Sequence, residues 1–236
     1  DIDGITLGTR YTQNQMKELL GTDRNETFEW KGQRADYKVI AFEQDAQSLD
    51  DILRGNGSPA EDSSSGSGSY LGCFMYHNRT IYINITAFKK DSKGIYEVGS
   101  MISSAEDTDD LNPEMKMTKE IYDKITEDIQ KDPGFNSMSE HDKYNAFEQR
   151  FLKVMARSWI NHERMHNFTK DEAQAWIYQA SQDSRYNAMA FLAAGDKYHD
   201  LNNTLNNAGI TMEDIADMSS EERSEKMSYI LENIMD

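Results

Sequence analysis

The segment His162-Glu163-Arg164-Met165-His166 has the residue types and the spacing of a hydrolytic metal site. On an α-helix, side chains four residues apart lie on the same face, so both imidazoles can reach one metal ion. The carboxylate of Glu163 can take the proton of a water molecule that the metal has acidified. The pattern therefore predicts metal-assisted hydrolysis, with Zn²⁺ as the expected cofactor and Glu163 as the general base.

A catalytic zinc ion needs a third protein ligand and an open position for water. Glu172, six residues after His166, is the best candidate for this ligand because it begins a new helical stretch. Residues 167–169 would turn the chain, with Thr169 as the N-cap of that helix. Two alternatives stay open: Glu172 is an acidic residue favoured only by the helix dipole, or His199 is the third ligand or a transition-state donor.

Further side chains near the motif are candidates for supporting roles. Tyr178, with Tyr186 and Tyr198 as alternatives, could stabilise an oxyanion. Asn161 and Asp171 could accept hydrogen bonds from the imidazole N–H groups and orient the rings. The single cysteine, Cys73, has no activating pattern beside it, and we expect a small buried thiol there.

The elements that must position these residues are mainly helical. Apolar residues recur at helical spacing before the motif, which predicts one long helix from Ser139 to His166. Pro113 is well placed to start the helix that precedes this long one, with Lys116–Gln130 following. The other predicted helices are Asp171–Gln182, Ser184–Ala194, Thr211–Met218 and Ser220–Ile234.

The first part of the chain has the composition of a small sheet. β-branched and aromatic residues predict strands, and Ile81, Ile83 and Ile85 alternate with more polar residues. A helix is expected at Thr12–Leu20 and a helical turn at Ser48–Leu53. The predicted strands are Ile5–Leu7, Phe28–Trp30, Tyr37–Phe42, Leu71–Tyr76, Thr80–Phe88 and Tyr96–Ile102.

These elements predict an α+β fold, with a small twisted sheet and a mainly helical C-terminal half that carries the motif helix. We divide the chain into a small α/β unit at 1–54, a flexible Gly/Ser-rich segment at 55–69, and a metal-binding domain at 70–236. The segment 55–69 is either a domain boundary or an insertion between two strands of one sheet.

Charge and hydropathy limit the possible partners. The net charge of −17 disfavours nucleic-acid binding, and no apolar run is long enough to cross a membrane. A peptide or protein substrate is expected, and the oligomeric state is open. Because the chain begins at Asp1, a cleaved signal peptide is one interpretation, so we expect a secreted or cell-envelope protein and leave a cytoplasmic one open.

The motif and its surroundings resemble the zincin superfamily of metallopeptidases. Glu172-Ala173-Gln174-Ala175 is similar to the second ligand helix of gluzincin-like members, in which glutamate is the third ligand. The spacing of six is similar to that of metzincin-like members, but Thr169 stands where those carry glycine. The resemblance implies a zincin-like fold, a peptidase activity, and a strand along the substrate cleft, for which Thr80–Phe88 is the candidate.

Two other functions stay open at this point. One is a catalytically inactive zincin-like protein with an interaction or structural role, such as an envelope or virion component. The other is a helical interaction protein without a metal. The position of Glu172 relative to the two histidines separates a metal site from an ordinary polar patch.

Overall fold

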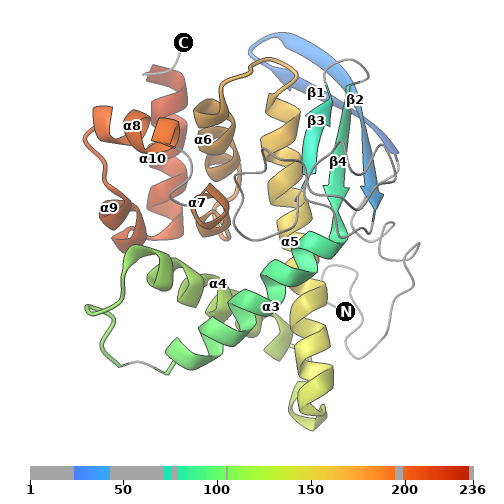
Figure 1. The fold of residues 1–236 in the computed structure, drawn as a ribbon, viewed down its shortest axis with the longest axis vertical. Helices are drawn as coiled ribbons and strands as arrows, with labels where there is room; N and C mark the ends of the chain where they lie inside the picture. The colour runs from blue at the N-terminus through green and yellow to red at the C-terminus, as the bar shows by residue number, and fades with distance from the viewer. Residues whose placement is uncertain (1–23, 43–71, 76–78, 105, 195–198, 234–236) are drawn as a thin grey trace, which may run out of the picture.

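The structure is a computed structural model that describes residues 24–42, 72–75, 79–104, 106–194 and 199–233. In these residues the chain forms a four-stranded sheet and a larger set of helices, so the predicted α+β class with a small sheet is confirmed (Figure 1). The elements expected at 5–7, 12–20 and 48–53 and the segment 55–69 lie outside the described residues, as does the side chain of Cys73.

The sheet begins with a hairpin of β1 (Arg24–Trp30) and β2 (Gln33–Phe42). Lys31 and Gly32 form the two-residue connection, and both have positive φ angles of 47° and 78°. Such a turn matches the right-handed twist of two paired strands, which is why short hairpins favour it. The hairpin extends both strands beyond the predicted Phe28–Trp30 and Tyr37–Phe42.

Two further strands complete the sheet in the order β1-β2-β4-β3. β4 (Thr80–Asn84) runs parallel to β2 and antiparallel to β3 (Gly72–Met75). Strands from both sides of residues 55–69 therefore share one sheet. β4 is an internal strand with a neighbour on each side, so its backbone has no free edge to offer to a substrate.

One strand prediction is wrong and another is only partly confirmed, because a helix occupies the chain from Ile85 onward. α3 (Ile85–Ile102) contains all of the strand predicted at 96–102 and the end of the one predicted at 80–88, of which Thr80–Asn84 forms β4. Ile85, Phe88, Ser92 and Gly99 are buried at intervals of three, four and seven residues, so the helical period determines which side is covered. At Gly99 a Cβ atom would lie 2.4 Å from Cβ of Tyr122, so α3 and α4 (Pro113–Gln130) approach closely there.

Most predicted helices are confirmed. Asn112 caps α4, since its side chain accepts a hydrogen bond from the Met115 amide at 2.8 Å. The helix predicted at 184–194 begins later, because the Asp183 carboxylate accepts the amides of Arg185 and Tyr186 in a turn. The remaining helices are α4 (Pro113–Gln130), η1 (Phe135–Ser137), α5 (Glu140–Met165), α6 (Glu172–Gln182), α7 (Ala188–Ala194), α8 (His199–Asn207), α9 (Met212–Asp217) and α10 (Ser220–Asn233).

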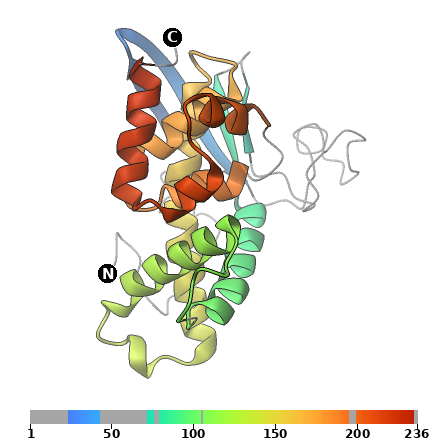
Figure 2. The same ribbon diagram turned by 90° about the vertical axis from the view of Figure 1, so that its left-hand side faces the viewer.

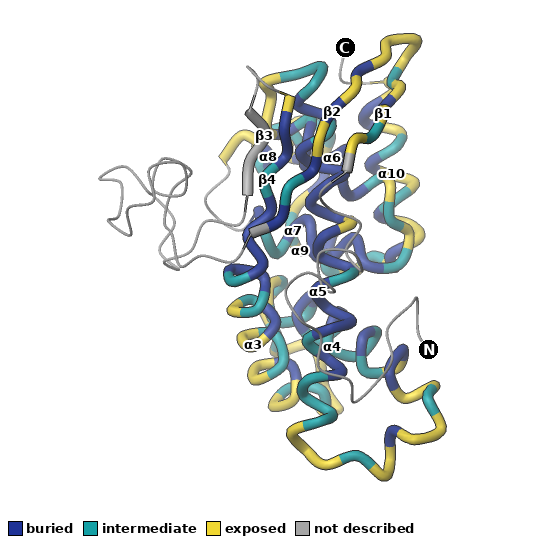
Figure 3. The backbone as a smooth tube through the Cα atoms, turned by 90° about the vertical axis from the view of Figure 1, so that its right-hand side faces the viewer, coloured by how far each residue is buried: buried dark blue, intermediate teal, exposed yellow. Residues whose placement is uncertain are grey.

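α5 is the central element that joins the two parts of the molecule. Its first half packs with α3 and α4 in the lower part of Figure 2, and its second half lies between the sheet and α6. Buried residues follow α5 and the strands beside it (Figure 3). The end of α5, which carries the two histidines, is therefore held by the sheet on one side and by α6 on the other.

No described helix is both long enough and apolar enough to cross a membrane.

Candidate metal centre

The two histidines of the motif lie at the C-terminal end of α5. Ser139 caps the start of this helix, where its side chain accepts the Asp142 amide at 3.1 Å. The helix ends at Met165, and His166 is its C-cap. His162 and His166 are one helical turn apart and are 2% and 5% exposed, so the helix presents both rings inside the protein.

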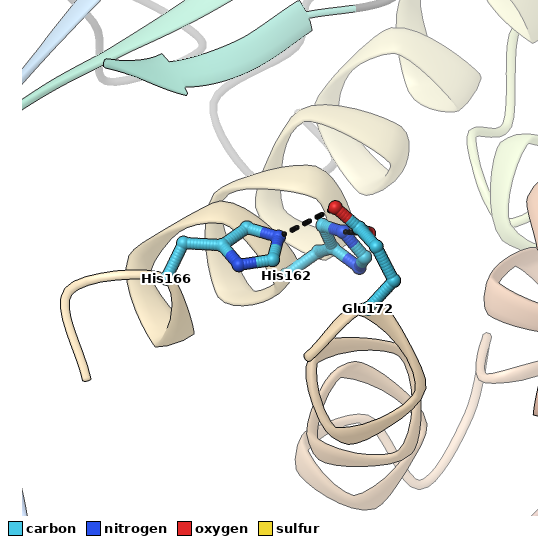
Figure 4. Close-up of side chains that lie close together, drawn as sticks. All are labelled: His162, His166 and Glu172. Atoms are coloured by element: carbon cyan, nitrogen blue, oxygen red, sulfur yellow. Dashed lines mark hydrogen bonds and ion pairs between the residues drawn. The ribbon is translucent and has the colours of Figure 1, made fainter. Parts of the chain in front are cut away.

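Glu172, the first residue of α6, reaches both imidazoles. Its Oε2 lies 3.1 Å from Nε2 of His162, and its Oε1 lies 3.2 Å from Nε2 of His166. Figure 4 shows the carboxylate extending from α6 toward the two rings on α5. One ligand atom from each of the three residues lies within 4.8 Å of the others. The structure thus brings together the three residues that the sequence predicts as metal ligands.

A short turn between α5 and α6 makes this approach possible. The amides of Phe168 and Thr169 both donate to the carbonyl of Met165, at 2.9 and 3.2 Å. No residue of this turn has a positive φ angle, so Thr169 can stand where a glycine was expected from the resemblance. The N-cap of α6 is Asp171 rather than the predicted Thr169, since the Asp171 side chain accepts the Ala173 amide at 2.9 Å.

The same turn fixes the orientation of His166. Nδ1 of His166 lies 2.9 Å from the carbonyl oxygen of Thr169. A carbonyl oxygen only accepts hydrogen bonds, so Nδ1 carries the proton and donates. In the neutral ring this leaves the lone pair on Nε2, which faces Glu172. A backbone carbonyl that orients a histidine in this way is a common outer partner of metal-binding imidazoles.

Two tryptophans surround His162. The Trp159 ring stacks on the imidazole with centroids 5.3 Å apart and an interplanar angle of 19°. The Trp176 ring, from α6, lies with its centroid 4.1 Å from that of the imidazole. Both tryptophans are buried, so they hold the ring in place and keep water away from it.

Burial and proximity shift the pKa values of the three groups. Burial lowers the pKa of His162, and the hydrogen bond to Glu172 offsets this only in part. Burial also opposes the charged form of His166, but the Glu172 hydrogen bond and the charges of Glu163 and Glu172 outweigh it and raise its pKa to about 9. For Glu172, the two imidazoles outweigh the effect of burial and hold the carboxyl pKa well below its usual range. The centre therefore favours an ionised carboxylate and a neutral His162.

Glu163 is buried next to the triad, with 5% of its surface exposed. Its negative charge is one of the influences that raise the pKa of His166. Glu163 is not one of the three residues whose donor atoms converge.

The structure does not bring the other predicted residues to the triad. Tyr178 is buried and accepts a hydrogen bond from Arg164 at 2.6 Å. Arg164 lies two residues from each histidine, a rotation of about 200° along a helix, so it points away from them. Tyr186 instead bonds to Arg150 and to the carboxylate of Asp128. Tyr198 lies outside the described residues.

His199, Asn161 and Asp171 likewise have other surroundings. His199 is exposed at the start of α8 and is not among the described residues that converge on Glu172. Asn161 is buried on α5, and Asp171 caps α6. Neither orients a described imidazole, because Nδ1 of His166 donates to a backbone carbonyl and Nδ1 of His162 has no hydrogen-bond partner in this structure.

The donor set fits a zinc ion. Zinc bonds to histidine nitrogen and carboxylate oxygen at about 2.0–2.2 Å, which places neighbouring donors of a tetrahedron about 3.3 Å apart. Each imidazole lies at about this separation from one carboxylate oxygen, Nε2 of His162 at 3.1 Å from Oε2 and Nε2 of His166 at 3.2 Å from Oε1 of Glu172. Glu172 is 46% exposed, so the centre opens to solvent on the carboxylate side. Three protein ligands with one open side would leave a position on a bound ion for water.

Comparisons of this chain with models of protein families, with curated proteins and with solved structures gave no match.

Proposed function

We propose that this protein is a zinc-dependent hydrolase of the zincin type that cleaves peptide bonds. The observation that carries the proposal is the convergence of His162, His166 and Glu172, three donors from two helices with one exposed side. The sequence around them contains the His-Glu-x-x-His pattern in the helical context that metallopeptidases require.

In this proposal the three ligands bind the ion, and Glu163 is the general base that transfers the proton. Bound zinc supplies a Lewis acid that polarises the scissile carbonyl and lowers the pKa of water. Glu163 accepts the proton of the attacking water and passes it to the leaving nitrogen. The burial of Glu163 supports this role, because a carboxylate shielded from bulk solvent exchanges protons with the bound reactants rather than with water outside.

The edge of the sheet is the place where we propose that a substrate binds. In the described part of the chain β3 is the last strand on its side of the sheet, and it packs near α5. An extended peptide can add to such an edge through backbone hydrogen bonds. β3 thus takes the part that the resemblance had suggested for residues 80–88.

The spacing and the types of the ligands combine features of two zincin subgroups. The third ligand follows His166 after six residues, as in metzincin-like proteins, but it is a glutamate, as in gluzincin-like ones. The turn of residues 166–171 supports this combination, because it reaches the next helix without a positive φ angle. We therefore propose a zincin-like centre that belongs to neither pattern in full.

Hydrolysis of a broad library of quenched fluorescent peptides tests the proposal. The wild-type protein should cleave some members, and a zinc chelator should abolish the cleavage. Glu163→Gln should lower kcat by about 10²–10⁴-fold while the protein keeps its zinc. Glu140→Gln, an exposed position at the far end of α5, is the matched control and should cleave like the wild type.

Two results would count against the proposal. If the wild type binds zinc but cleaves no peptide, the protein is a zincin-like binding or structural protein instead. If Glu163→Gln cleaves as fast as the wild type, Glu163 is not the base.

A further inference from the structure

Two short rows of polar side chains face each other across the contact between α5 and α6. Ser158, His162 and His166 are spaced by four residues on α5, and Glu172 and Gln179 are spaced by seven on α6. Both spacings keep side chains on one face of a helix. Glu172 meets the two histidines at the open end, and Gln179 lies deeper.

Gln179 is held firmly in this contact. Its side chain is 0% exposed, and its Nε2 donates a hydrogen bond of 2.6 Å to Oγ of Ser158, which is itself 2% exposed. In this arrangement the amide nitrogen donates and the hydroxyl oxygen accepts, although a serine hydroxyl can also donate. The amide oxygen Oε1 is then the end that remains for another partner.

Oε1 of Gln179, an acceptor, and Nδ1 of His162 are two buried polar atoms of this contact that have no hydrogen-bond partner in the structure. The donor Nε1 of Trp159, whose ring stacks on His162, is another. A buried polar atom without a partner destabilises the folded state, so such atoms are uncommon in folded proteins. Ser158, which bonds the Gln179 amide, lies one helical turn before His162 on the same face of α5, so the amide and the imidazole are neighbours, although no hydrogen bond joins them in this structure.

Metal binding gives these two atoms complementary roles. When Nε2 of a neutral histidine binds a metal, the proton of the ring is on Nδ1, and Nδ1 becomes a donor that needs an acceptor. His166 has such an acceptor in the Thr169 carbonyl. For His162, Oε1 of Gln179 is a buried acceptor that is free to take this proton.

We propose that Gln179 is a positioning residue for His162, with Ser158 holding its amide so that Oε1 accepts the Nδ1–H hydrogen bond and Nε2 stays aimed at the metal. This inference rests on the proposed zinc site and adds the device that fixes its most buried ligand. Trp159 and Trp176 restrict the plane of the ring, and Gln179 selects which nitrogen carries the proton.

Zinc affinity, measured by competition with a chromophoric chelator, tests the role of Gln179. Gln179→Leu keeps the approximate volume but removes the acceptor, and we expect zinc to bind about 10–100-fold more weakly. Gln179→Glu keeps an acceptor, and the Ser158 hydroxyl can donate to it, so the affinity should stay within a few-fold of the wild type. Gln182→Leu, at an exposed position of the same helix, is the matched control and should bind zinc normally.

A second measurement does not depend on any substitution. In the zinc-bound wild type, nuclear magnetic resonance should detect a slowly exchanging Nδ1–H proton on His162, protected by its hydrogen bond. A third measurement compares the variants. The visible spectrum of the cobalt-substituted protein should change in Gln179→Leu and be restored in Gln179→Glu, which a general loss of stability would not produce.

The outcomes separate this inference from the proposed function. If the wild type and Gln179→Leu bind zinc equally, or if the Nδ1–H proton of His162 exchanges rapidly, Gln179 has no positioning role although the zinc site stands. If Gln179→Leu does not fold, the exchange rate of the His162 Nδ1–H proton and the zinc affinity of Gln179→Glu test the positioning role instead. If the wild type binds no zinc, both the proposed function and this inference are overturned.

Discussion

Oε2 of Glu172 lies 3.1 Å from Nε2 of His162, across the contact of two helices and ten residues apart in the sequence. Without a metal, this contact is an ion pair or a hydrogen bond, and with a metal the two atoms are neighbouring ligands. The exposed fraction of the two partners differs greatly, at 46% for the carboxylate and 2% for the imidazole. The carboxylate is thus the side from which an ion or a substrate can enter.

Replacing the carboxylate tests whether Glu172 is a ligand. Glu172→Gln keeps the size of the side chain but removes its negative charge, and we expect zinc affinity to fall by more than about 100-fold, beyond the loss typical for outer partners. Chelator competition measures it. The control is Asp171→Asn, because asparagine also caps helices well and Asp171 does not reach the imidazoles. Equal losses in the two variants would contradict a ligand role for Glu172.

Tyr178 is predicted to act in stability rather than in catalysis. Its hydroxyl accepts the Nη2 hydrogen bond of Arg164, whose guanidinium carbon lies 4.4 Å from the centroid of the Phe28 ring. Tyr178→Phe leaves this half-buried donor without its partner, so the free energy of unfolding should fall by about 1–3 kcal/mol. Chemical denaturation measures this change. A large loss of kcat with unchanged stability would instead place Tyr178 in the reaction.

A half-buried carboxyl on α3 should make stability depend on pH. Asp91, on α3, lines a cavity of about 360 Å³ between α3, α4, α5 and α7. Burial raises the pKa of Asp91 to about 6. The folded state therefore binds the proton more tightly than the unfolded state, and the stabilising contribution of the neutral form is lost as the pH rises from about 4 to about 6.

The variant Asp91→Asn isolates this effect. It removes the ionisation, so at pH 8 it should be more stable than the wild type by about 2–3 kcal/mol, and at pH 4 the difference should be small. Urea denaturation of both proteins from pH 4 to pH 8 gives the comparison. A stability difference that does not change across this range would show that Asp91 is not responsible.

The helices of the site could be predicted because their signals are local. Ser139 is a good N-cap, and Phe147 and Phe151 keep the helical period that leads to the motif. The spacing of six between His166 and Glu172 was enough to suggest a third ligand. The position of the helix Asp171–Gln182 followed from the same kind of evidence, although its cap is Asp171 rather than Thr169.

The parts that could not be predicted depend on contacts between distant residues. Ile81, Ile83 and Ile85 alternate like a strand, but packing of α3 against α4 and α5 makes the chain helical from Ile85. Gln179 and Ser158 meet only when α5 and α6 pack, at a separation of 21 residues. Gln179 lies seven residues after Glu172, and Ser158 lies four residues before His162. These spacings point to Gln179 and Ser158 only after Glu172 and His162 have been identified as ligands.

The zinc content of the purified protein tests the central claim most directly. Inductively coupled plasma mass spectrometry should find about one zinc ion per chain in the wild type, as expected for a mononuclear site. His162→Ala should contain almost none, whereas His199→Ala, which replaces an exposed histidine outside the triad, should keep the wild-type content. A wild type without stoichiometric zinc after reconstitution, or a His162→Ala variant that retains it, would contradict the account.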